Sequence, residues 1–254
     1  MTIDVALAAL FGAMIGSFLN VCIYRLPRGK SVGVDRSRCT ACDRQLAWFD
    51  NIPLVSFIVL SGRCRTCRER ISIRYPIVEL LTAILFAAAW WYYGPEWLLV
   101  SRLVLGCALI VLFAIDLEHH LLPNVITLPG IVVGFALSVV TEPGWQASLL
   151  GLVIGGGVLY AIAEGYYRLR HEEGVGMGDV KMLSMIGAFL GWPLVLVTLM
   201  LASLAGSIVG LGLIATGRGS MKYALPFGTF LAMGAALAAT VGPSLLRWYI
   251  GLLR

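Results

Sequence analysis

Two aspartates, Asp116 and Asp179, stand at the ends of long apolar runs. Asp116 closes one run in "LFAIDLEHHLLPN", and Asp179 opens another in "GMGDVK". Ionisable residues are costly within or at the edge of a membrane segment and tend to mark functional sites. Two neighbouring carboxylates can share one proton, so that one activates water while the other protonates a carbonyl oxygen. If the fold brings them together, this pair can therefore perform the chemistry of an aspartic protease.

A structural interpretation of the same two residues stays open. Asp179 would then be an ordinary helix N-cap, and Asp116 a solvated charge at a helix end. In the functional interpretation, Gly176 and Gly178 let the backbone approach an extended substrate, and a helix N-terminus favours the ionised form of Asp179. Lys181 either reaches toward the membrane surface or adjusts the charge of the pair.

Four cysteines form a second candidate site. Cys39 and Cys42 make one C-x-x-C pair, Cys64 and Cys67 make another, and 21 residues separate the pairs. This spacing is typical of a zinc ribbon, in which four thiolates complete a tetrahedral site and leave no open position for catalysis. Disulfides are the alternative, but they do not persist in a reducing compartment. We predict a structural zinc site.

The composition indicates which elements hold these residues. Hydrophobic residues make up 59% of the chain, charged residues 13%, and the mean hydropathy is +0.88. Ordinary soluble domains have roughly 25% charged residues, so this composition excludes them. The apolar runs reach the ~20 residues of a spanning helix, and they lack the alternation of barrel strands. We predict an all-α polytopic membrane protein with about eight transmembrane helices and a small zinc-ribbon-like loop.

The weakest division between spans is "LGWP", where Gly191 and Pro193 interrupt one long run. Six or seven spans therefore remain alternatives to eight. We expect a first transmembrane helix at 1–24, a four-cysteine loop at 25–75 and a transmembrane core with both aspartates at 76–254. The eight predicted spans cover residues 3–23, 77–93, 97–115, 123–141, 146–166, 180–191, 193–216 and 224–250.

Basic residues are concentrated on one side of the predicted spans. The segment 25–75 holds 11 Lys and Arg residues against four acids. Cytoplasmic loops carry an excess of Lys and Arg, so this side is expected to face the cytoplasm, with both aspartates at that boundary. The net charge of +5 therefore reports topology and gives no support for nucleic-acid binding. In total, 16 of the 19 basic residues lie on this side once Arg168, Arg170, Lys181, Arg218 and Lys222 are included.

Six motifs follow one another along the chain: "GSFLNVCIYRLP", the four-cysteine loop, "RYPIVELLT", "IDLEHHLLPN", "GMGDVK" and "LPFGTFLAMG". In this order, they resemble the bacterial type IV prepilin peptidase family of GxGD membrane aspartic peptidases. The resemblance covers nearly the whole chain and implies that Asp116 and Asp179 cut a short basic leader from type IV prepilins or type II secretion pseudopilins at the bacterial inner membrane. Thr229 stands where a second proline is common, and we expect this departure to leave the chemistry untouched.

The resemblance also implies methylation of the new N-terminal residue with S-adenosylmethionine. The sequence lacks the glycine-rich fingerprint of soluble methyltransferases, so we expect the donor to bind where the membrane core meets the cysteine loop. Glu79 and Lys30 are the candidate contacts. The four cysteines favour the bifunctional type. The alternatives are a peptidase without methyltransferase activity, an intramembrane protease for other substrates, and a non-enzymatic membrane scaffold of a secretion system.

Overall fold

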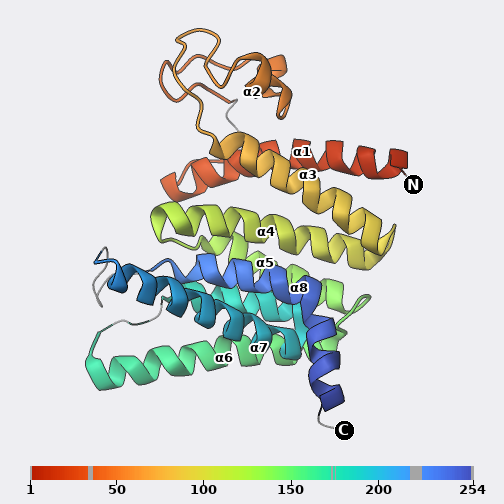
Figure 1. Cartoon of the computed structure of the whole chain (residues 1–254), viewed down its shortest axis with the longest axis vertical. Coiled ribbons are helices and arrows are strands. Elements are labelled where there is room, and N and C mark those ends of the chain that lie inside the picture. Colours follow the sequence, from red (N-terminus) through yellow and green to blue (C-terminus); the bar gives the residue numbers. More distant parts are fainter. Residues whose placement is uncertain (1, 34–36, 173, 175, 218–224, 253–254) are drawn as a thin grey trace. The chain divides into compact units, whose positions relative to one another are not determined.

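The computed structural model describes residues 2–33, 37–172, 174, 176–217 and 225–252, and these residues are helical apart from loops and two isolated bridges (Figure 1). The prediction of an all-α multi-pass membrane protein is confirmed. Arg36, Arg218 and Lys222, which we counted among the basic residues of one side, lie outside the described residues. Within the described residues, six helices are long and apolar enough to cross a membrane: α1 (Thr2–Arg25), α3 (Arg74–Tyr93), α4 (Trp97–His119), α6 (Trp145–Arg170), α7 (Met177–Ala215) and α8 (Phe227–Leu252).

Helix α7 is interrupted within the predicted "LGWP" break. Gly191 has φ 78° and ψ 171°, outside the helical region. An unbroken helix of 39 residues would measure about 58 Å, almost twice the ~30 Å core of a bilayer. Leu183 and Val195, on opposite sides of the break, both approach Gly155 of α6, so the chain folds back at Gly191. The two halves correspond to the predicted spans 180–191 and 193–216.

A shorter apolar helix, α5 (Asn124–Ser138), lies where we predicted the span 123–141. With α5 and the two halves of α7, the described residues contain eight apolar helical segments. The chain divides into two compact units, Met1–Val111 and Leu112–Arg254. The functional division at 24/25 and 75/76 stays a prediction.

In the first unit, α1 packs against α3 through glycines. A Cβ atom on Gly12 would lie 2.7 Å from the Cβ of Phe86, and one on Gly16 would lie 2.7 Å from the Cα of Glu79. Such contacts leave no space for a side chain, and small residues at a helix interface are typical of membrane proteins.

In the second unit, α6 and α7 approach even more closely. A Cβ atom on Gly187 would lie 2.1 Å from the carbonyl oxygen of Gly151. Nearby, the Ser148 hydroxyl donates a hydrogen bond of 2.6 Å to the carbonyl of Ala188. The first half of α7, which begins beside Asp179, is therefore held directly on the backbone of α6.

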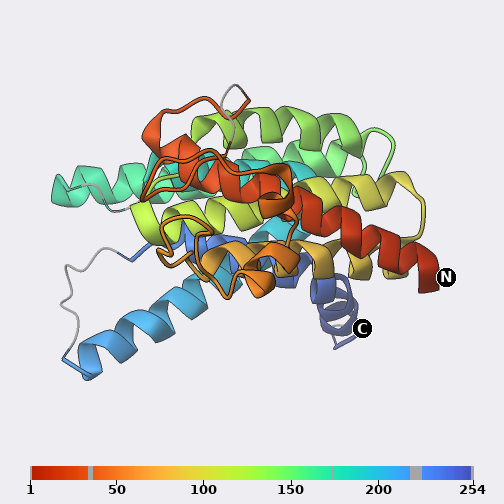
Figure 2. The ribbon, with the colours of Figure 1, turned by 90° about the horizontal axis from the view of Figure 1, so that it is seen from above.

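The four-cysteine loop connects α1 with α3 in the first unit. It contains three short helical segments, η1 (Leu26–Arg28), η2 (Trp48–Asn51) and α2 (Val55–Val59). Figure 1 shows the loop with α2 on one outer side of α1 and α3, and in Figure 2 the loop overlies these two helices. The isolated bridges pair Arg38 with Gln45 and Arg63 with Arg70, so that one bridge encloses each C-x-x-C pair.

Candidate functional site

Asp116 is buried near the C-terminal end of α4, with 5% of its surface exposed. Its Oδ2 atom accepts two hydrogen bonds from Thr229, one from the backbone N–H at 2.7 Å and one from the hydroxyl at 3.1 Å. Thr229 is the third residue of α8, where the first backbone N–H groups have no partner within the helix. Asp116 therefore caps α8, and the dipole of that helix favours a negative charge there.

Asp179 is the third residue of α7 and is 9% exposed. The N-cap of the helix is Gly176, and its backbone N–H donates a hydrogen bond to the Asp179 carboxylate. An acid at the third position that bonds back to the N-cap amide is half of a capping box. The structural interpretation is therefore wrong on both counts, because the N-cap is Gly176 rather than Asp179 and because Asp116 is buried.

The N-termini of α7 and α8 come together around one leucine. A Cβ atom on Gly178 would lie 3.0 Å from the Cβ of Leu122, and one on Gly228 would lie 2.9 Å from the Cδ1 of the same leucine. The carboxylates of Asp116 and Asp179 interact electrostatically. Two acidic side chains, each bound to backbone N–H groups of a helix start, thus share one buried site within the second unit.

The glycines of this site provide space. A Cβ atom on Gly176 would lie 3.2 Å from Asp179 Oδ2, and one on Gly228 would lie 3.0 Å from Asp116 Oδ2. A side chain at either position would crowd a carboxylate oxygen. Gly176 thus leaves space for the Asp179 carboxylate. This steric role is separate from the approach of the backbone to a substrate, which we expected.

Three residues of the site were missed by the sequence analysis: Leu122, Gly228 and Thr229. Thr229, which we expected to leave the chemistry untouched, donates both of these hydrogen bonds to Asp116. A signal was present in "LPFGTF", since a proline before an apolar run marks a helix start with free N–H groups.

Lys181 does not bond to either aspartate in the described geometry. Its Nζ atom donates a hydrogen bond of 3.0 Å to the side-chain oxygen of Asn124, the first residue of α5. Lys181 thus connects the start of α7 with the start of α5.

We expect Lys181→Met to lower thermal stability modestly. Loss of one hydrogen bond from a half-buried ammonium group should cost about 1 kcal/mol and shift Tm by about 2–4 °C. Thermal unfolding in detergent measures the shift, and Lys30→Met, at an exposed position, is the matched control. An unchanged Tm for Lys181→Met would contradict this role.

The four cysteine sulfurs lie within 4.8 Å of one another and could hold a metal ion. Cys39 Sγ and Cys67 Sγ are 3.8 Å apart. Zn–S bonds of about 2.3 Å in a tetrahedron place the sulfurs about 3.8 Å apart, so the donor set fits zinc. All four thiols are free, so the alternative of disulfides is not realised here.

The two C-x-x-C pairs have the same backbone geometry. The N–H of Cys39 donates to the carbonyl of Arg44 at 2.9 Å, and the N–H of Cys64 donates to that of Glu69 at 2.8 Å. The turns contain Asp43 and Arg68 at φ 53° and 61°. Each pair therefore forms a tight turn that presents both sulfurs on one side.

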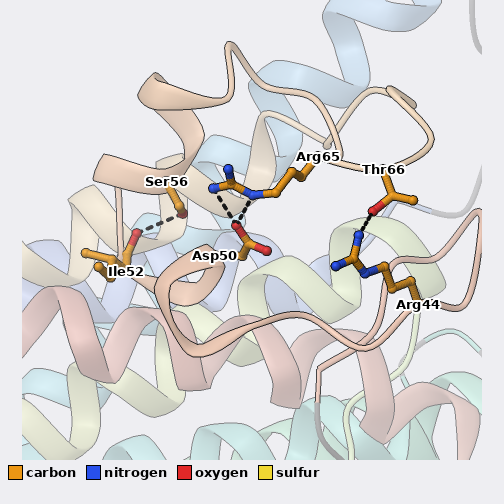
Figure 3. A network of polar contacts seen from close by, with 6 residues as sticks. All are labelled: Arg44, Asp50, Ile52, Ser56, Arg65 and Thr66. Atoms are coloured by element: carbon orange, nitrogen blue, oxygen red, sulfur yellow. Dashed lines mark hydrogen bonds and ion pairs between the residues drawn. The ribbon is translucent and has the colours of Figure 1, made fainter.

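Side-chain contacts connect the two turns with the segment between them. Arg44 donates to Thr66 across the pairs, and Arg65 binds Asp50 at 2.9 Å (Figure 3). The backbone N–H groups of Cys67 and Thr66 bond to the Cys64 sulfur and lower the pKa of this thiol to about 6. A lowered thiol pKa favours the thiolate, which is the form that binds a metal.

The structure places both candidate contacts for a methyl donor in the first unit. Glu79 is buried on α3, and its Oε2 accepts a hydrogen bond of 2.8 Å from the backbone N–H of Leu54. Lys30 is exposed just after α1. Asn20, on α1, donates to the carbonyl of Tyr75, while its buried Oδ1 has no hydrogen-bond partner.

Comparison with known proteins covers most of the chain. The family model "Bacterial Peptidase A24 N-terminal domain" matches residues 10–93, and "Type IV leader peptidase family" matches residues 103–211. The chain is 37% identical to a prepilin leader peptidase/N-methyltransferase of Aeromonas hydrophila over 96% of this chain and 93% of that protein. It is 32% identical to the protein of that name from Pseudomonas aeruginosa over 95% and 91%. No solved structure matches the chain.

Proposed function

Since the chain belongs to the type IV prepilin leader peptidase/N-methyltransferase family, we propose that it removes the leader of prepilins or pseudopilins and methylates the new N-terminal residue. One observation carries the first activity: Asp116 and Asp179 are buried together at the starts of α8 and α7. A membrane scaffold has no need to bury two interacting acids, since exposed acids would be far less costly.

In the proposed reaction, the aspartate pair adds water to a peptide carbonyl. Asp116 is the better candidate for the charged carboxylate that takes a proton from water, because two donors hold its Oδ2. Asp179 carries the shared proton and gives it to the carbonyl oxygen. Collapse of the tetrahedral intermediate breaks the C–N bond, and the leaving amine receives a proton from the pair.

We propose that the aspartates lie at the cytoplasmic boundary of the inner membrane. The distribution of basic residues supports this orientation. A basic leader would remain in the cytoplasm while the apolar stem of the substrate lies in the bilayer, so the bond to be cut lies at the boundary. Gly176 and Gly178 would border the path of that bond.

We propose that S-adenosylmethionine binds in the first unit. When bound, this donor would supply the methyl group for the free amine of the cut substrate, and it carries a positive sulfonium centre. The carboxylate of Glu79 and the unpartnered Oδ1 of Asn20 are buried acceptors that fit cationic or N–H groups of such a ligand. Lys30, which is exposed, would suit its carboxylate.

We propose that the four cysteines bind one structural zinc ion. Replacement of all four by serine should lower bound zinc at least about tenfold, because hydroxyls are poor zinc ligands. Elemental analysis of purified protein measures the metal. The matched control is the double variant Cys22→Ser, Cys107→Ser, which alters the two cysteines outside the cluster and should retain zinc. Equal zinc in all three proteins would refute the site.

The test of the function is mass spectrometry of a model prepilin incubated with the purified protein in detergent, with and without S-adenosylmethionine. Loss of the leader establishes the peptidase. A methyl increment that requires the donor establishes the second activity, and cleavage without it leaves a peptidase alone. An intact substrate in both incubations favours the scaffold.

Thr229→Val should slow cleavage about tenfold with little change in KM. The variant removes the hydroxyl bond to Asp116 and keeps the backbone donor, and a hydrogen bond to a charged group contributes about 1.5 kcal/mol. Thr229→Ser restores the hydroxyl and should restore the rate. Equal rates for the valine and serine variants would show that this bond does not matter.

A further inference from the structure

The middle of the four-cysteine loop differs in composition from its flanks. Residues 46–60 read "LAWFDNIPLVSFIVL" and contain one charged side chain, Asp50, among fifteen positions. Asp50 is mostly buried and bound to Arg65. The turns on either side are rich in arginine. An apolar stretch this long is unusual for a loop in water, because soluble loops are polar and turn-forming.

Six of the apolar side chains of this segment are exposed. Trp48 is 78% exposed, Ile58 73% and Val59 69%, and Phe49, Ile52 and Val55 are exposed as well. Scattered apolar residues are normal on a protein surface, but a group within twelve residues marks a surface that something covers. Two short helices in this segment, η2 and α2, satisfy backbone hydrogen bonds internally. An apolar environment requires this, because it offers no water to the backbone.

Contacts with α3 fix the depth of this segment. The backbone N–H of Leu54 donates to Glu79, the sixth residue of α3, about 7–8 Å along that helix from its start. Figure 1 shows the loop with α2 to one side of α1 and α3 rather than beyond the start of α3. Because α3 is apolar and long enough to span, its first turns lie where headgroups meet acyl chains.

The neighbouring surface has the same chemistry. Ile73, Ile77 and Leu80 at the start of α3 are exposed and apolar as well, so this end of α3 also presents a surface that lipid would contact. Tryptophan is enriched at the interface, and arginine is attracted to anionic headgroups. The exposed arginines of the two turns are Arg38, Arg44, Arg63, Arg65, Arg68 and Arg70.

We propose that residues 46–60 lie in the membrane interface, with Trp48, Ile58 and Val59 among the acyl chains and the arginines of the turns at anionic headgroups. The loop is then an interfacial element rather than a domain free in the cytoplasm. The Glu79 carboxylate holds it at this depth through Leu54, and Arg65 attaches the second cysteine turn to it through Asp50. This inference does not depend on the catalytic activity.

Photo-crosslinking of the full chain in nanodiscs of phosphatidylcholine and phosphatidylglycerol tests the proposal. Benzoylphenylalanine replaces Ile58 in one protein and Glu69, an exposed residue of the second cysteine turn, in the control. Intact-mass spectrometry should find lipid adducts at position 58, enriched in phosphatidylglycerol, and few or none at position 69. A crosslink to a second copy, a crosslink within the chain, or the absence of adducts at position 58 would overturn the proposal.

Trp48 provides a second measurement with minimal change to the protein. The difference in emission between wild type and Trp48→Phe isolates this residue from the other six tryptophans. Lipid that carries a nitroxide on the acyl chain near the headgroup should strongly quench the Trp48 emission obtained in this way. Aqueous iodide should quench it weakly. The reverse order would place the segment in water and overturn the proposal even if position 58 gave lipid adducts.

Discussion

Asp116→Asn and Asp179→Asn should each lower the rate of leader cleavage by about 10³-fold or more. Asparagine has nearly the shape of aspartate, and at position 116 its side-chain oxygen can still accept the hydrogen bonds from Thr229. It cannot take a proton from water or deliver one to a carbonyl oxygen. Either change should therefore remove the chemistry while the helices stay folded.

Release of the leader from a model prepilin, followed by mass spectrometry, measures this loss. Asp43→Asn is the matched control, because Asp43 is an exposed aspartate that pairs with Arg38 in the first cysteine turn. A substrate supplied without its leader should still be methylated by all three variants if the two activities use separate sites. Near-normal cleavage by either Asp116→Asn or Asp179→Asn would contradict the aspartate mechanism and favour a scaffold.

The composition was enough to predict the helical membrane architecture, because a bilayer permits few ways to satisfy backbone hydrogen bonds. The break at Gly191 could also be predicted, since glycine and proline in "LGWP" disfavour a continuous helix. Each cysteine pair could be predicted from spacing, because a C-x-x-C turn is a local structure, and the need of zinc for four ligands groups the two pairs. In each of these cases the determining interactions lie close together in the sequence or are imposed by the solvent.

The partners of the aspartates could not be predicted in the same way. Thr229 lies 113 residues after Asp116, and the two meet only because α8 starts beside the end of α4. Leu122 lies close to both Gly178 and Gly228, because the starts of α7 and α8 meet there. Glu79 likewise binds Leu54 across 25 residues. These contacts depend on how helices pack, which hydrophobic patterning does not specify within a membrane.

Gly187→Ala should strongly destabilise the protein, although alanine is the better helix former. The added Cβ would lie 2.1 Å from the carbonyl oxygen of Gly151 and 2.4 Å from its carbonyl carbon, so α6 and α7 would have to separate. Backbone atoms cannot rotate away as a side chain can. The cost should exceed the ~1–3 kcal/mol of ordinary overpacking.

The matched control makes the same substitution on the partner helix. Gly157 lies in α6, and a Cβ there meets nothing within 4 Å, so Gly157→Ala should leave Tm unchanged or raise it slightly. Thermal unfolding and the yield of monodisperse protein compare the two variants. Gly187 lies eight residues after Asp179 on the same half of α7, so any surviving Gly187→Ala protein should also cleave slowly. Equal stability of the two alanine variants would mean that α6 and α7 are not in backbone contact, and that another packing brings Asp179 to Asp116.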